Sequence, residues 1–237
     1  MNSHLEDRVD AAGDKRVRAL VDKRIRTRKP AAYLLNEAWL GPHRFYVDER
    51  VIVPRSFIAE ILLAGAAWGA PQSILDLCTG SGCLAILAAL AYPDAAVDAA
   101  DISPDALAVA QRNVDDYDLA ARVRLVESDL FSALEGRRYD LILSNPPYVK
   151  AASMRKLPAE YRKEPDLALA SGADGLDHTR RILADACEHL NPRGLLVVEI
   201  GHNRKALEKA FPRLPFQWPK TSAGAGYVFT LRREALR

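Results

Sequence analysis

Four consecutive residues, Asn145-Pro146-Pro147-Tyr148, follow directly after the apolar run Tyr139–Ser144. A proline cannot donate a hydrogen bond to a sheet ladder, so two prolines end a strand abruptly and leave one carboxamide and bare carbonyls at its carboxyl edge. In open α/β sheets, ligands bind at that edge. The Asn145 side-chain oxygen and the Pro146 carbonyl can each accept one hydrogen from a planar NH2 group, and Tyr148 offers a flat wall. The motif therefore predicts a site for a conjugated nitrogen.

A second motif, Asp-Leu-Cys-Thr-Gly-Ser-Gly-Cys at residues 76–83, lies between an expected strand and an expected helix. Its glycines let a ligand approach the backbone, and a helix N-terminus favours a carboxylate or phosphate. Gly80, Gly82 and Ala85 also satisfy the dinucleotide pattern, with Asp101 at the distance of a ribose partner. The loop alone therefore does not separate a nicotinamide cofactor from S-adenosylmethionine.

The residues downstream of the glycine loop separate these two cofactors. Asp129 follows the third strand, where it can accept a hydrogen bond from an adenine amino group or serve as a turn residue. Asp101 likewise can bind a ribose or cap the helix that Ser103-Pro104 begins. A dehydrogenase does not need the NH2-binding site that Asn145 to Tyr148 would form. A methyltransferase that acts on a conjugated nitrogen does need such a site.

The elements that position these motifs alternate between strand and helix from Ser73 onward, which predicts an α/β fold with a mostly parallel, doubly wound sheet. We expect strands at 74–77, 96–101, 123–126, 139–144 and 195–200, helices at 82–92, 103–117, 175–190 and 203–211, and a closing antiparallel pair at 214–218 and 227–231. Residues 73–237 form the main domain in this interpretation.

Residues 1–72 have a different pattern, which indicates a small accessory region. We expect a basic helix at 14–28, a hairpin at 39–47, an extended segment at 51–55 and a helix at 57–68 capped by Ser56. The basic stretch is by default a solvated helix face, and the alternative is a contact with RNA.

Composition narrows the class of protein. The chain has 237 residues and is 49% hydrophobic, which is enough for one full hydrophobic core. Its net charge of +2 does not by itself indicate a protein that binds nucleic acid. Its 3 cysteines favour a reducing compartment, and Cys78 and Cys83 lack zinc spacing, so we expect no metal. Residues 1–7 lack a signal-peptide core, and the apolar run 83–92 is too short to span a membrane. We expect a soluble cytoplasmic protein.

The order of these motifs resembles the HemK/PrmC/PrmB family, the class I Rossmann-like methyltransferases that modify a glutamine amide in translation proteins. Val53-Pro54-Arg55, Glu164-Pro165 and the segment 169–176 resemble further stretches of that family, and the likeness runs from about Pro30 to the C-terminus. The segments 45–56 and 78–83 resemble the PrmB branch, which modifies the large-subunit ribosomal protein L-three. The family has a longer N-terminal helical domain, whereas here about one helix precedes the hairpin.

The resemblance implies S-adenosylmethionine as the cofactor and a ribosomal protein as the partner, with ribosomal RNA as the candidate contact of the basic helix. It implies catalytic roles for Asn145, Pro146 and Tyr148 and substrate contacts by Asn145, Pro146, Pro147, Tyr148, Arg55 and Glu164. The expected cofactor residues are Asp76, Cys78, Thr79, Gly80, Gly82, Asp101, Ile102, Asp129, Leu130 and Asn145.

Three other functions stay open at this point. A release-factor glutamine methyltransferase would share the same chemistry. A nucleic-acid methyltransferase acting on an exocyclic amine would share the Asn-Pro-Pro-Tyr corner, although no target-recognition domain is evident. A non-catalytic factor would bind the cofactor without turnover.

Overall fold

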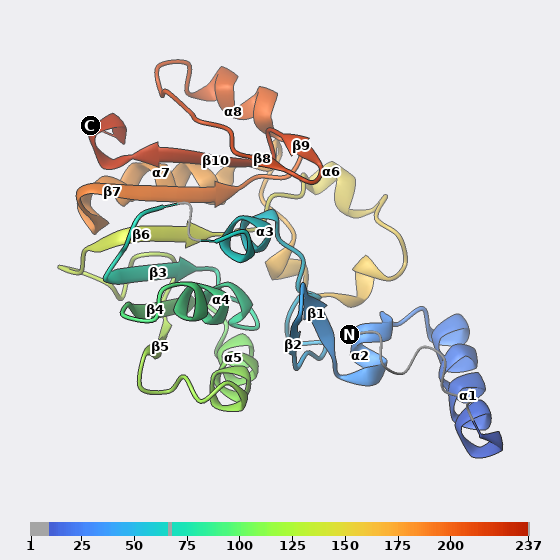
Figure 1. Ribbon diagram of the computed structural model, residues 1–237. Coiled ribbons are helices and arrows are strands. Elements are labelled where there is room, and N and C mark those ends of the chain that lie inside the picture. The colour runs from blue at the N-terminus through green and yellow to red at the C-terminus, as the bar shows by residue number, and fades with distance from the viewer. Residues whose placement is uncertain (1–9, 66–67, 237) are drawn as a thin grey trace.

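The computed structural model describes residues 10–65 and 68–236 and is built on a six-stranded sheet of order β10-β7-β6-β3-β4-β5 (Figure 1). The strands are β3 Ser73–Leu77, β4 Ala96–Asp101, β5 Val123–Glu127, β6 Tyr139–Ser144, β7 Leu190–Glu199 and β10 Val228–Arg232. β10 pairs antiparallel with β7, and every other pair in this sheet is parallel. The mostly parallel α/β fold with an antiparallel C-terminal strand is therefore confirmed.

The order of the strands creates a switch point beside β3. The chain runs outward from β3 through β4 to β5 and then returns to place β6 on the other side of β3. Loops that leave β3 and β6 therefore diverge in opposite directions and open a crevice at their carboxyl ends.

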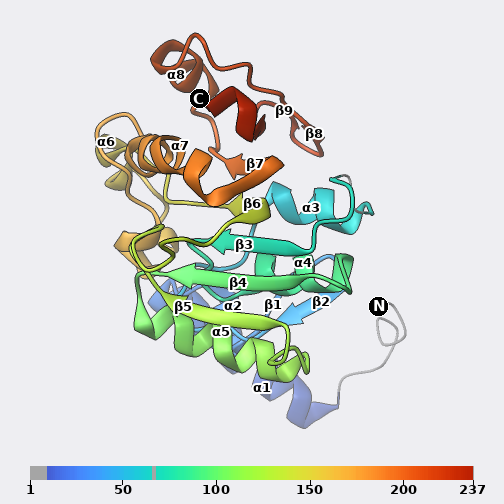
Figure 2. The same cartoon turned by 90° about the vertical axis from the view of Figure 1, so that its left-hand side faces the viewer.

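Helices cover both faces of the sheet, because side chains along each buried strand alternate between the two sides (Figure 2). On one face, α3 Phe57–Leu63, α4 Cys83–Ala91 and α5 Pro104–Asp116 contribute to the core around Ile74 and Leu141. On the other face, α7 Asp177–His189 and α8 Arg204–Ala210 pack over Leu75 and Ile142.

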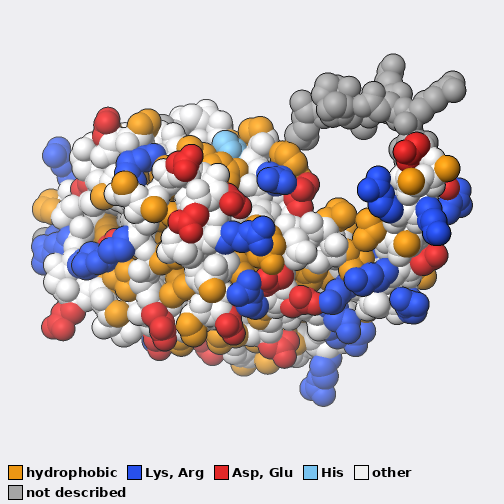
Figure 3. Space-filling model, turned by 90° about the horizontal axis from the view of Figure 1, so that it is seen from below, with side chains coloured by type: hydrophobic (Ala, Val, Ile, Leu, Met, Phe, Trp, Pro, Cys, Tyr) orange, Lys and Arg blue, Asp and Glu red, His pale blue; other side chains and the backbone are white. Residues whose placement is uncertain are grey.

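The accessory region forms a separate small core against α5. Its elements are α1 Ala11–Thr27, α2 Ala31–Leu35, β1 Ala38–Leu40 and β2 His43–Phe45, so the expected basic helix and hairpin are confirmed. Val47 and Val51 pack against Ala106 and Val109 of α5. Gly13 is the one buried residue of α1, and Lys and Arg side chains gather at the end of the molecule that carries this helix (Figure 3).

The chain between β6 and α7 folds into short turns that the sequence pattern did not indicate. These are α6 Ala151–Met154 and the 3-10 turns Tyr161–Lys163 and Asp166–Ala168. A small hairpin, β8 Lys220–Thr221 and β9 Gly224–Ala225, and a last 3-10 turn, Arg233–Leu236, complete the described elements.

Three expected elements differ from the structure. The antiparallel pair 214–218/227–231 is reduced to a single bridge between Gln217 and Thr230, because Pro215 and Pro219 flank Gln217 and cannot donate to a ladder. The helix expected at 57–68 ends at Leu63, shortly before Gly65 turns left-handed with φ +95°. The strand expected from 195 begins at 190, across a register shift in its pairing with β6.

Two further expectations are not decided by these elements. The domain boundary at residue 73 stays a prediction, and the signal-peptide argument concerns residues 1–7, which lie outside the described part of the chain. Within residues 10–65 and 68–236, none of the helices combines the length and apolar character needed to cross a membrane.

Candidate active site

The carboxyl ends of β3, β4, β5 and β6 converge on a cavity of about 310 Å³. Seven of the ten residues expected to bind the cofactor line it, namely Cys78, Gly80, Asp101, Ile102, Asp129, Leu130 and Asn145. Parallel strands bring their carboxyl ends to one edge of a sheet, so residues that follow different strands meet there. We refer to this space as the first cavity.

The other three expected cofactor residues, Asp76, Thr79 and Gly82, do not line the first cavity but shape the loop beside it. One Asp76 oxygen accepts hydrogen bonds from Thr79 Oγ1 at 2.6 Å and from the Ala85 backbone N–H at 3.0 Å. Its other oxygen has no partner among the described residues, and burial raises the pKa of this carboxyl to about 7. At Gly82, an added Cβ would lie 3.1 Å from the Ala110 Cβ, so glycine lets α4 begin close against α5.

The two acidic residues at the cavity differ in their surroundings. Asp101 accepts the backbone N–H groups of Gly80 at 2.8 Å and Ser103 at 3.0 Å, and burial raises its pKa. It thus ties the glycine loop to the start of α5. Asp129 is exposed and forms an ion pair with Arg181 at 2.8 Å, which holds its pKa below the usual range. A ribose contact by the first and an adenine contact by the second stay predictions.

A second cavity of about 430 Å³ lies on the other side of the Asn-Pro-Pro-Tyr motif. Asn145, Pro146 and Tyr148, the three residues expected to be catalytic, line it together with Arg55. Asn145 lines both cavities, whereas Pro147 lines only the first of the two. Asn145 therefore lies between the two cavities, as do Ile52 and Ala168, which also line both.

The orientation of the Asn145 carboxamide follows from its one hydrogen bond. Its Nδ2 donates to the main-chain carbonyl of Arg55 at 3.2 Å. Because a carbonyl can only accept, the NH2 end must face Arg55, which leaves the Oδ1 end pointing elsewhere. That oxygen is buried and has no partner among the described residues. A buried acceptor without a partner is costly, so a donor that reached this oxygen would be stabilised.

Arg55 and Glu164, both expected to contact substrate, bind each other. The guanidinium donates to the two carboxylate oxygens at 2.8 and 2.5 Å, and the Glu164 side chain is only 3% exposed. The guanidinium also lies 4.6 Å from the ring centroid of Tyr161. Glu164 lines neither of these two cavities, whereas Leu167 of the same loop lines the first. The ion pair therefore connects the accessory region to the segment between β6 and α7, of which Pro165, Leu167 and Ala168 line the first cavity. We refer to this segment as the loop over the site.

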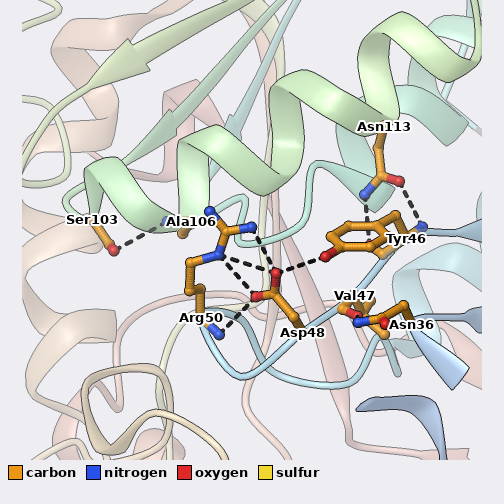
Figure 4. Close-up of polar contacts among 8 residues, drawn as sticks. All are labelled: Asn36, Tyr46, Val47, Asp48, Arg50, Ser103, Ala106 and Asn113. Atoms are coloured by element: carbon orange, nitrogen blue, oxygen red, sulfur yellow. Dashed lines mark hydrogen bonds and ion pairs between the residues drawn. The ribbon is translucent and has the colours of Figure 1, made fainter. Parts of the chain in front are cut away.

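One wall of the first cavity comes from the segment 45–56, which carries a family resemblance but no expected site residue before Arg55. The Arg50 side chain lies beside the first turn of α5 (Figure 4). Asp48 accepts hydrogen bonds from the Arg50 guanidinium at 2.6 Å and from the Tyr46 hydroxyl at 3.0 Å (Figure 4). Asn113 of α5 accepts from the Tyr46 N–H at 2.7 Å and donates to its carbonyl at 3.0 Å (Figure 4). It also donates to the carbonyl of Ser81 in the glycine loop at 2.8 Å. Asn113 thus joins the accessory region, α5 and the glycine loop.

His178 and Arg181 of α7 also line the first cavity without having been expected there. Burial lowers the pKa of His178, whose ring nitrogen lies 2.9 Å from Ser171 Oγ. Only contact across the folded chain could reveal these residues, since nothing in their local sequence indicates a ligand.

The sequence of this chain is similar to those of known methyltransferases. Residues 58–160 match the model of the methyltransferase small domain. The ribosomal protein uL3 glutamine methyltransferase of Neisseria meningitidis serogroup B is 56% identical over 98% of this chain and 78% of its own length. The protein of the same name from Bordetella pertussis is 54% identical over 100% of this chain and 81% of its own.

Solved structures with low sequence identity share the fold. A methyltransferase from Pyrococcus furiosus aligns with a TM-score of 0.60 at 18% identity, covering 93% of this chain and 98% of that one. The hMettl16 catalytic domain, in complex with the MAT2A 3'UTR hairpin 6, aligns with a TM-score of 0.61 at 14% identity, covering 79% and 74%.

Proposed function

Because this chain belongs to the family of ribosomal protein uL3 glutamine methyltransferases, we propose that it transfers a methyl group from S-adenosylmethionine to the side-chain amide nitrogen of a glutamine in uL3. The observation that carries the proposal is that Asn145 lines both cavities while its side-chain oxygen has no partner among the described residues. A primary amide presents an N–H to such an acceptor.

In this proposal the first cavity holds the cofactor and the second holds the glutamine side chain. Asp101 accepts hydrogen bonds from ribose hydroxyls, Asp129 accepts from the adenine amino group, and Cys78, Gly80, Ile102 and Leu130 line the remaining contact surface. Asp76, Thr79 and Gly82 act by fixing the glycine loop. When bound, the cofactor supplies an activated methyl group on its sulfonium.

The protein's own residues make an amide nitrogen able to receive that group. An amide nitrogen is a poor nucleophile because its lone pair is delocalised into the carbonyl. Asn145 Oδ1 accepts one N–H and the Pro146 carbonyl accepts the other, which favours positive charge on nitrogen and aims the lone pair. Tyr148 bounds the amide plane. Positioning of this kind contributes ~7–11 kcal/mol to lowering a barrier. The nitrogen gains the methyl group and loses one proton to water or to a backbone carbonyl.

A transfer assay with labelled S-adenosylmethionine tests this function against its alternatives. Isolated uL3 and a release factor serve as parallel acceptors, and tandem mass spectrometry locates the methyl group. We expect label on a uL3 glutamine. Label on the release factor instead would keep the chemistry and overturn the substrate. Cofactor binding without transfer to either protein would favour a nucleic-acid acceptor or a non-catalytic role.

We propose in addition that α1 contacts ribosomal RNA when uL3 is presented in an assembling particle. Residues 10–29 contain eight Lys or Arg and three Asp, and most of the basic side chains are exposed. Arg24 and Arg28 bind Glu160 at 3.1 and 2.6 Å, which fixes the helix near the loop over the site. The cytoplasm, where ribosomes assemble, is the location that this proposal requires.

A further inference from the structure

The last residue of β7 and the turn that follows it contact Tyr148 at three separate points. Asn203 Nδ2 donates to the main-chain carbonyl of Tyr148 at 2.8 Å. The Tyr148 hydroxyl lies 3.5 Å from one carboxylate oxygen of Glu199, at the outer limit of a hydrogen bond. Gly201 lies between them in the sequence and faces the tyrosine ring. The hydroxyl, the ring and the backbone of one residue are therefore each held by the same five-residue segment.

The Tyr148 ring restricts position 201 to glycine in addition to the backbone angle. The φ of Gly201 is +54°, a left-handed value that favours glycine, although Asn36 and Cys78 adopt similar values with side chains in this chain. An added Cβ would also lie 2.7 Å from Tyr148 Cε2 and 2.9 Å from its Cδ2. Contacts this short do not occur, so any side chain at position 201 must displace the ring.

Glu199 and Asn203 are themselves buried, with 2% and 6% of their surface exposed. The second Glu199 oxygen accepts from Ser56 Oγ at 2.7 Å and from the Phe57 N–H at 2.8 Å. This carboxylate therefore joins the start of α3 to the end of the Asn-Pro-Pro-Tyr motif. Buried polar groups with fixed partners hold one arrangement of their neighbours rather than several.

We propose that Glu199, Gly201 and Asn203 are positioning residues that form a cradle for Tyr148 and so set the wall of the glutamine pocket against Asn145. This inference rests on the proposed glutamine methylation. Tyr148 lines the second cavity but not the first, so a displaced ring changes the fit of the acceptor amide and leaves the cofactor site as it is. A misplacement of about 1 Å at a reacting group costs on the order of 10²-fold in rate.

The substitution Gly201→Ala tests the cradle, with Gly136→Ala as its matched control. Gly136 also has a positive φ, +73°, but an added Cβ there meets nothing within 4 Å. We expect Gly201→Ala to lower kcat for methyl transfer to uL3 by about 10–100-fold while the cofactor Kd changes less than twofold. Gly136→Ala should change neither. Equal kcat values for the two variants would contradict the proposed role of the cradle in positioning Tyr148.

A double-mutant cycle keeps the test decisive if Gly201→Ala does not fold. Glu199→Gln and Tyr148→Phe are measured singly and together. If the carboxylate acts through the hydroxyl, Glu199→Gln lowers kcat more in the unmodified protein than beside Tyr148→Phe, where only its contacts with Ser56 and Phe57 remain to be lost. If the two substitutions have fully additive effects on the free energy of activation, Glu199 does not act through the Tyr148 hydroxyl. Absence of transfer by the unmodified protein would instead overturn the proposed function, and with it the role of the cradle.

Discussion

The main-chain carbonyl of Arg55 accepts a hydrogen bond from the Asn145 carboxamide at 3.2 Å, while the side chain of the same arginine is bound by Glu164 at 2.8 and 2.5 Å. Arg55 therefore connects the loop over the site to the group that we propose as catalytic. The arrangement explains how an accessory segment, distant in sequence, fixes the orientation of the Asn145 carboxamide.

Arg55→Ala should destabilise the protein. The substitution leaves the buried carboxylate of Glu164 without its partner, and because the Arg55 side chain is 35% exposed the expected cost is on the order of 1–3 kcal/mol. Arg18→Ala, which removes an exposed ion pair with Asp14, should cost about 1 kcal/mol or less. Urea unfolding of both variants measures the difference. A similar small loss for Arg55→Ala would show that the pair does not hold the loop.

Asp101→Asn should weaken cofactor binding more than Asp129→Asn. Hydrogen bonds to a charged group contribute about 1.5–3 kcal/mol, so loss of the ribose contacts should raise the Kd by about 10–100-fold. Asp129 is exposed and already paired with Arg181, so we expect less than tenfold there. Calorimetric titration with S-adenosylmethionine measures both, and Asp94→Asn, in an exposed turn, is the control. A larger effect at Asp129 would reverse the assignment.

Much of this site was predictable because its residues follow parallel strands. Asp101, Asp129 and Asn145 lie at the ends of β4, β5 and β6, and the sheet brings such ends together whatever the loops do. The resemblance singled out the segment 45–56, but the place of Arg50 in the cavity wall was not predictable, because Asn113 anchors this segment through contacts with Tyr46 across 67 residues. No local pattern encodes contacts of that kind. The short 3-10 turns near Glu164 were missed for the same reason.

The buried carboxyl of Asp76 should make the unliganded protein less stable as the pH rises. Its pKa is about 7 in the folded state, above the ordinary value near 4 in the unfolded chain, so the folded state binds more protons between these values. The free energy of unfolding therefore falls as the pH rises from about 4 to 7. Between pH 5.5 and 8 we expect this group to contribute a loss of about 2 kcal/mol.

Asp76→Asn isolates that contribution, because the amide oxygen can still accept from Thr79 and Ala85. Urea unfolding of the unmodified protein and of the variant is compared at both pH values. The free energy of unfolding should change less between the two pH values in the variant than in the unmodified protein. An identical change in both proteins would mean that Asp76 does not titrate in this range.

Removing charge from α1 should weaken binding to an RNA-containing ribosomal precursor. Arg16, Arg18 and Arg26, all exposed, are changed together to Gln. Each lost phosphate contact should reduce the slope of log K against log salt by about 1. The matched control changes Lys205, Lys209 and Arg213 to Gln, at and after α8, far from α1 (Figure 1). Equal salt slopes for the two triple variants would exclude α1 as the RNA contact.

The central claim is that Asn145 acts on the glutamine amide through its unpartnered oxygen. The most direct test is the single-turnover rate of methyl transfer to uL3 by Asn145→Ala, measured beside the Kd for S-adenosylmethionine. Loss of one preorganised polar contact typically costs 10²–10³ in rate, so we expect a fall of about that size or more, with the cofactor Kd changed less than about twofold. An unchanged rate, or a rate that falls only in parallel with cofactor affinity, would contradict the account.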